Sequence, residues 1–157
     1  MRPTAATFGC GFLCASLALS VSEGIAAGDL LRVSGAWASP TVPGQSVGAA
    51  YMRLHSEQNA SLVKIETDVS SGAEIHQMTV VNDVMRMRRL EQVELPAGQT
   101  VDLAPGRQHV MLVDLRHPLQ VGDRVSVTLT LRLRNGHAAR QTVIVPVLRK
   151  AAHGAPQ

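Results

Sequence analysis

The sequence has few cysteines, and their positions remove them from the chemistry of a mature protein. Among its 157 residues only Cys10 and Cys14 carry a thiol. Both lie in an N-terminal segment that starts with Arg2, continues through small and apolar residues at 5–21 and reaches Ala27, which is typical of a secretory signal peptide. Cleavage near Ala27 would leave no disulfide, no thiolate nucleophile and no thiolate metal ligand.

This segment sets the predicted domain boundaries. We expect a signal peptide at 1–27, one β domain at 28–150 and a disordered tail at 151–157. A signal-anchor helix is the competing interpretation, but glycines and serines interrupt the apolar run, which falls short of the roughly 20 residues that a span needs. Leu13 is too bulky for the position before a lipidated cysteine, so we expect no lipid on Cys14. The sequence therefore predicts an exported protein.

Aromatic residues are also scarce, and the charge is modest. Phenylalanine, tyrosine and tryptophan together make up 3% of the chain, and the formal net charge is +3. Few aromatic side chains disfavour a platform for stacking nucleic-acid bases, and export disfavours nucleic acid as a partner more strongly.

Helical periodicity is missing from the rest of the chain, which instead predicts one strand after another. Residues 124–134 alternate apolar with polar side chains, so one face should be buried and the other wet. Asn135-Gly136 then favours a two-residue type I′ hairpin. The predicted strands are 30–37, 49–55, 62–67, 73–81, 84–90, 100–103, 109–115, 124–134 and 140–148. Such a series indicates an all-β sandwich or Greek-key barrel.

Histidine and methionine gather in two short stretches of this pattern. If Asn82 and Asp83 form a two-residue hairpin loop, Met78 lies opposite Met87, with His76 diagonal to Met87. The side chains that then share one face of the hairpin are His76, Met78, Met85 and Met87. Further along, His109 and Met111 share a face of another strand. The two groups converge if these strands are neighbours.

Imidazole and thioether groups form a soft donor set that favours Cu(I) over Zn(II), Ca(II) or Mg(II). The missing thiolate excludes a blue-copper electron-transfer site. Two other interpretations stay open. One is an exported, non-catalytic β-sandwich with a structural or adhesive role and its methionines in the core. The other is an enzyme that uses His76 or His109 as a base, for which no paired acid or nucleophile is evident at a usable spacing.

The spacing of these residues resembles that of the PCu(A)C family of periplasmic copper chaperones. The family pattern is a histidine, ten residues, a methionine, twenty-one residues and then His-x-Met. In this sequence His76, Met87, His109 and Met111 stand at those intervals. The segments 35–54 and 95–131 also resemble the family, so the likeness covers essentially the whole predicted domain.

The resemblance implies a cupredoxin-like β-barrel that binds Cu(I) through His76, Met87, His109 and Met111. It further implies a periplasmic carrier, not an enzyme, that delivers copper toward the CuA site of cytochrome c oxidase, directly or through a Sco-type protein. The family often has a methionine directly after its first histidine, where this chain has Gln77 followed by Met78. Candidate auxiliary ligands are Met78 and Met85, and His153 could join a weak site in the tail.

Overall fold

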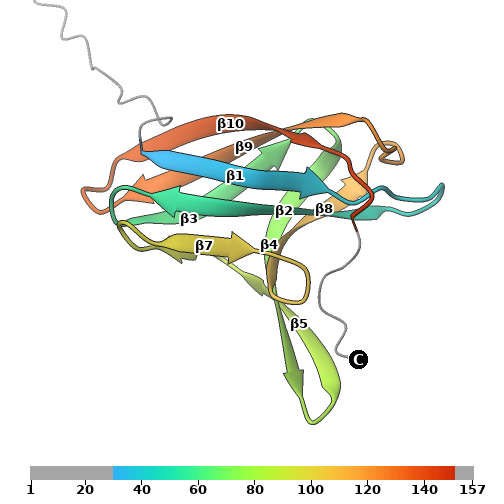
Figure 1. The fold of residues 1–157 in the computed structure, drawn as a ribbon, viewed down its shortest axis with the longest axis horizontal. Coiled ribbons are helices and arrows are strands. Elements are labelled where there is room, and N and C mark those ends of the chain that lie inside the picture. Colours follow the sequence, from blue (N-terminus) through green and yellow to red (C-terminus); the bar gives the residue numbers. More distant parts are fainter. Residues whose placement is uncertain (1–29, 151–157) are drawn as a thin grey trace, which may run out of the picture.

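The computed structural model describes residues 30–150, which form ten strands and no helix (Figure 1). The strands are β1 (Leu31–Ala38), β2 (Val47–Ser56), β3 (Ala60–Thr67), β4 (Ser70–Val81), β5 (Val84–Leu90), β6 (Val93–Leu95), β7 (Thr100–Leu103), β8 (Gln108–Leu115), β9 (Arg124–Leu133) and β10 (Ala138–Pro146). No helix that could span a membrane occurs within the described range. The predicted signal peptide and tail lie outside it.

The strands form one sheet that curls into a nearly closed barrel. Its order is β1-β2-β7-β8-β4-β3-β9-β10, with β5 added beside β4 and β6 beside β3. The two ends of this order meet where Ala38 bridges Val147 and accepts a hydrogen bond from the backbone N–H of Leu148. The predicted all-β, cupredoxin-like barrel is confirmed.

Alternating side chains fill the barrel, as the sequence predicts. Along β9, Val125, Val127, Leu129 and Leu131 are fully buried, whereas the intervening serine and threonines are partly exposed. Burying each such aliphatic side chain contributes about 1.5–3 kcal/mol. Strand β2 shows the same alternation, and on both strands it leaves a second row of side chains on the outer surface of the sheet.

The loop between β9 and β10 differs from the prediction. The connection is residues 134–137, and of these only Gly136 has a positive φ, of 82°, whereas a type I′ turn needs two such residues. The resulting register places Ala139 opposite Leu131, and both are buried. The predicted two-residue loop would have placed Arg140 there, facing the core. Core pairing therefore overrides the turn preference of Asn135-Gly136.

Strand β6 was not predicted. It has three residues, of which Val93 and Leu95 are buried, and it pairs with the start of β3. Three residues are too few to show alternation in the sequence.

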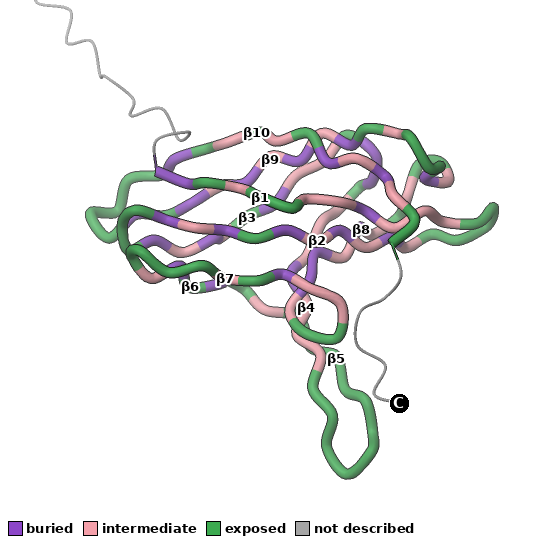
Figure 2. Tube along the Cα trace, in the orientation of Figure 1, coloured by how far each residue is buried: buried purple, intermediate pink, exposed green. Residues whose placement is uncertain are grey.

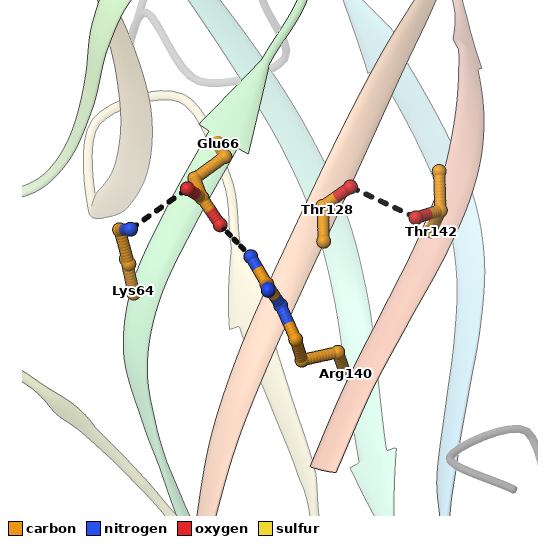
Figure 3. Close-up of polar contacts among 5 residues, drawn as sticks. All are labelled: Lys64, Glu66, Thr128, Arg140 and Thr142. Atoms are coloured by element: carbon orange, nitrogen blue, oxygen red, sulfur yellow. Dashed lines mark hydrogen bonds and ion pairs between the residues drawn. The ribbon is translucent and has the colours of Figure 1, made fainter. Parts of the chain in front are cut away.

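The outer surface of β3, β9 and β10 carries lateral polar contacts (Figure 3). Glu66 accepts hydrogen bonds from Lys64, at 2.7 Å, and from Arg140. Beside them the hydroxyls of Thr128 and Thr142 lie 2.8 Å apart. Exposed pairs of this kind add little to stability.

The far ends of β4 and β5 form an arm that extends beyond the body of the barrel (Figure 1) and is exposed over most of its length (Figure 2). Its tip is the predicted two-residue turn, because Asn82 and Asp83 both have positive φ, of 52° and 60°. The predicted register is also confirmed, with Val81 opposite Val84 and Met78 opposite Met87.

Candidate metal centre

The two predicted histidines face each other across neighbouring strands. Strand β8 pairs antiparallel with β4, and in this register His76 is directly opposite His109. Their ring centroids are 6.3 Å apart. The adjacent pair in the ladder, Ile75 and Val110, is buried in the barrel, so the histidines occupy the outer face.

The methionines are arranged around this pair on the same face. Met111 is opposite Glu74 in the β4–β8 ladder, one row below the histidines, and Met87 is opposite Met78, one row above. Both Met87 and Met111 are thus diagonal neighbours of His76, at a spacing that long side chains can bridge.

Exposure differs among these methionines. Met87 is 44% exposed and Met85 is 64% exposed, whereas Met52 is buried in the core. The interpretation that the methionines fill the core is therefore wrong for the arm. Met85 lies opposite Val80 near the tip, about 13 Å along the strand from the histidine row. The structure brings Met78 closer to the histidines than Met85.

A carboxylate that sequence reasoning missed contacts the first histidine. Glu74 Oε2 is 2.9 Å from His76 Nε2, and Glu74 Oε1 is 3.0 Å from Arg89 Nη1. The hydrogen bond from His76, assisted by the positive charge of Arg89, holds the pKa of Glu74 below its ordinary value. The available signal was position, because Glu74 and His76 are two residues apart and share a face.

The second histidine is more deeply enclosed. His109 is 5% exposed and lies between the rings of Tyr51 and His76, with the Tyr51 centroid 6.2 Å away. Its Nδ1 is 3.3 Å from the backbone carbonyl oxygen of Arg107. Burial lowers the pKa of His109; the carbonyl partly opposes this effect, and nearby His76 adds to it. His109 is therefore favoured in its neutral, metal-binding form.

An aromatic row continues from His109 across the sheet. Tyr51 on β2 packs against Trp37 on β1 with centroids 4.6 Å apart, and Lys150 Nζ lies 5.5 Å from the Trp37 centroid. This row places aromatic rings on the β2 side of the histidine pair, whereas the exposed β4–β5 arm begins on the other side.

The geometry fits a metal ion held by two imidazoles and sulfur. Two rings that bind one ion through bonds of about 2.0–2.1 Å have centroids about 5–6 Å apart, close to the observed 6.3 Å. His76 Nδ1 is buried and has no hydrogen-bond partner. Within residues 30–150 no three histidine, cysteine or acidic side chains are grouped to hold a metal. A site here would therefore need the methionine sulfurs.

The strand order and this outer face define a β domain of the PCuAC type. The solution structure of CuI-DR1885 from Deinococcus radiodurans is 26% identical, covers 82% of this chain and 82% of its own, and has a TM-score of 0.55. The copper-bound PCuAC domain from PmoF2 is 20% identical with a TM-score of 0.59, covering 74% of this chain and 91% of its own. The resemblance seen in the sequence is confirmed.

The chain belongs to the LpqE-like family, described as "Putative lipoprotein LpqE-like", whose profile matches residues 31–147. "Putative lipoprotein Lxx21020" from Leifsonia xyli is 30% identical over 120 residues, which are 76% of this chain and 70% of that protein. "Uncharacterized protein RP573" from Rickettsia prowazekii is 37% identical over 98 residues, 59% of this chain and 54% of that protein.

Proposed function

We propose that this protein binds one Cu(I) ion as cargo through His76, Met87, His109 and Met111 and passes it to another protein. One observation carries the proposal. Two imidazoles face each other across β4 and β8, beside methionines on the same face. His76 Nδ1 has no hydrogen-bond partner, and the contact of His109 Nδ1 with the Arg107 carbonyl oxygen leaves the lone pair of that ring on Nε2. Two thioethers and two imidazoles suit a soft monovalent ion.

Transfer, and not turnover, suits the placement of the ligands. An incoming ligand must reach copper before the old ligands leave, and the exposure of Met87 on the arm would permit this approach. An adhesive sandwich would not need thioethers on a solvent-exposed hairpin. The likeness to the copper-bound PCuAC domain and to CuI-DR1885 supports copper as the cargo.

The compartment and the acceptor complete the proposal. The lipoprotein names of the family and of the Leifsonia relative support export, as does the N-terminal segment, and we propose that the protein works in the periplasm. We expect delivery toward the CuA site of cytochrome c oxidase, directly or through a Sco-type protein, on the strength of the PCu(A)C resemblance. The absence of a lipid on Cys14 stays a prediction, because Cys14 lies outside the described residues.

Two measurements test copper binding. Titration of the exported protein with Cu(I) against a competing chelator, without oxygen, should give one ion per chain. X-ray absorption at the copper edge should show both sulfur and nitrogen scatterers. A shell of nitrogen and oxygen alone would exclude the methionines and overturn the proposed ligand set.

Transfer needs its own test. Copper-loaded protein mixed with a copper-free CuA domain or Sco-type protein should lose its copper to the acceptor, as measured after separating the two by size. Retention of all copper by the loaded protein with both acceptors would contradict delivery along this route.

A further inference from the structure

The hydrogen bonds around the two histidines are of different kinds, and the difference decides which nitrogen each ring can offer. At His76 the contact is between Nε2 and a carboxylate oxygen of Glu74, at 2.9 Å. At His109 the contact is between Nδ1 and the carbonyl oxygen of Arg107, at 3.3 Å. Both partners can only accept a hydrogen bond, so the ring nitrogen in each contact carries the proton.

A neutral imidazole has one N–H and one lone pair. With its proton on Nε2, His76 keeps a lone pair on Nδ1, the buried atom for which the structure gives no partner. With its proton on Nδ1, His109 keeps its lone pair on Nε2. The two rings therefore present different nitrogens, and the carboxylate decides the choice at His76.

We propose that Glu74, held in place by Arg89, is a positioning residue that fixes His76 as its Nε2–H tautomer and so presents Nδ1 to copper. This inference rests on the proposed function, because it assigns the ligand atom within the same site. A carboxylate that orients a metal-binding histidine in this way raises the basicity of the ring and restricts its rotation.

Arg89 has the position that this role requires. It lies opposite His76 in the β4–β5 ladder, and its guanidinium is 3.0 Å from Glu74 Oε1, leaving Oε2 to accept from His76. Both carboxylate oxygens are thus engaged by side chains of this network. Glu74 is therefore held away from acting as a hard oxygen ligand itself, which keeps the site soft.

A merely structural ion pair is the competing explanation. The side chain of Arg89 is 67% exposed and that of Glu74 is 28% exposed, and pairs with this exposure contribute little to stability. The positioning role instead predicts effects on the His76 ring and on copper, with the fold intact.

The test uses Glu74→Ala, Glu74→Gln and a matched control, Glu66→Gln. Glu66 is also a β-strand glutamate bound by two cationic side chains, Lys64 and Arg140, but it lies on the β3–β9–β10 surface (Figure 3). The glutamine at 74 can still accept from Nε2–H, yet its amide can also donate to the other tautomer, so it should have an intermediate effect and serve as partial rescue.

The first readout is the tautomer in copper-free protein, from nitrogen-15 NMR of the imidazoles under conditions where both are neutral. The parent and Glu66→Gln should show Nε2–H at His76 and Nδ1–H at His109. Glu74→Ala should give a mixture at His76 alone. An unchanged Nε2–H tautomer at His76 in Glu74→Ala would overturn the proposal, whatever copper does.

The second readout is copper itself. Cu(I) is diamagnetic, so coordination should shift the nitrogen-15 resonances of His76 Nδ1 and His109 Nε2 in the parent. Chelator competition should show about a tenfold or greater loss of affinity in Glu74→Ala, a smaller loss in Glu74→Gln and none in Glu66→Gln. A copper-induced shift at His76 Nε2 would overturn the assignment.

The variant His76→Ala distinguishes failure of this inference from failure of the proposed function. If that variant loses copper affinity while Glu74→Ala keeps it, the positioning role is wrong and the metal site stands. If His76→Ala keeps the parent affinity, the proposed function and this inference both fall. Thermal melts establish that each variant is folded, and Glu74→Gln carries the test if Glu74→Ala does not fold.

Discussion

The position of each side chain of the proposed metal centre is set by its row on the sheet and by its neighbours. His76 and His109 share a row, yet one is tied to a carboxylate near the surface and the other is enclosed by Tyr51 and the backbone. Met87 lies on the exposed β5 side of the row, and Met111 lies on β8 in the body of the barrel. Single substitutions should therefore separate copper binding from folding.

Leucine in place of a ligand methionine removes sulfur at nearly the same volume. Met87→Leu and Met111→Leu should each weaken Cu(I) binding at least about tenfold, which corresponds to about 1.4 kcal/mol. The substitution should change stability by less than about 1.5 kcal/mol. Chelator competition measures the affinity, and thermal melts measure the stability.

Met52→Leu is the matched control, because Met52 is buried in the core away from the histidine face; it should leave copper affinity unchanged. Met78→Leu should have a mild effect. If Met87→Leu bound copper like the parent while Met78→Leu failed, Met78 would be the ligand on this arm.

The affinity for copper should depend on pH through the histidines. Only the neutral ring binds a metal, and burial lowers the pKa of His109 from the ordinary 6.5, so Cu(I) binding should be constant at high pH and weaken as the pH falls through this lowered pKa. Thioethers add no such dependence. Chelator competition between about pH 7.5 and 5 measures this, and an affinity that stayed flat over that range would contradict histidine ligands.

His109 should also make the copper-free protein sensitive to acid. Its pKa is lowered in the fold from the ordinary 6.5, chiefly by burial, so the unfolded chain takes up this proton at a higher pH than the folded chain. The stability from His109 is then complete above about pH 6.5 and is lost as the pH falls through the lowered pKa. Urea unfolding of the parent and of His109→Gln should show a smaller loss of stability on acidification in the variant; equal losses would contradict this.

At the scale of elements, the β4–β5 arm places Met87 through its turn. Asn82 and Asp83 both have positive φ, which proline cannot adopt because its ring fixes φ near −65°. Asp83→Pro should therefore disrupt the pairing of the arm and weaken Cu(I) binding about as much as Met87→Leu. The melting temperature should change little, because the arm is exposed and outside the core (Figure 2).

Asp83→Gly is the control, since glycine adopts positive φ without strain, and it should keep the parent affinity. Equal copper binding by Asp83→Pro and Asp83→Gly would mean that the arm does not position a ligand. Circular dichroism and chelator competition on both variants decide between these outcomes.

Local sequence signals predicted the β4–β5 arm, but they did not predict which strand lies beside it. The Asn82-Asp83 turn fixes the register between adjacent strands, so the Met78–Met87 pairing followed from sequence. That β8 lies beside β4 is a contact between segments far apart in the chain, and only the packing of the whole barrel determines it. The Asn135-Gly136 turn failed for the same reason, because the register there follows the buried residues of β9 and β10. Glu74 was missed because its only signal was the two-residue spacing to His76, which every pair of alternate residues on a strand shares.

At the scale of the whole molecule, the core and the proposed metal centre occupy opposite faces of the same sheet. The barrel interior is filled by aliphatic side chains such as Leu129 and Val110, whereas the histidines and methionines project outward from β4, β5 and β8. This separation lets a rigid barrel support ligands that stay open to exchange.

Stability and copper binding should therefore change independently. Leu129→Ala removes a fully buried side chain and should lower the free energy of unfolding by about 2–5 kcal/mol. Because no ligand moves, its folded form should bind Cu(I) with the parent affinity. Copper at about one hundred times its dissociation constant should then stabilise both proteins by the same amount, about 2.7 kcal/mol. Urea unfolding with and without Cu(I), followed by circular dichroism in the absence of oxygen, measures both quantities.

Met87→Leu serves as the opposite control, with near-parent stability and a smaller stabilisation at the same copper concentration. A copper-induced stabilisation that disappeared in Leu129→Ala would mean that the core sets the ligand geometry directly and that the two faces of the sheet are coupled.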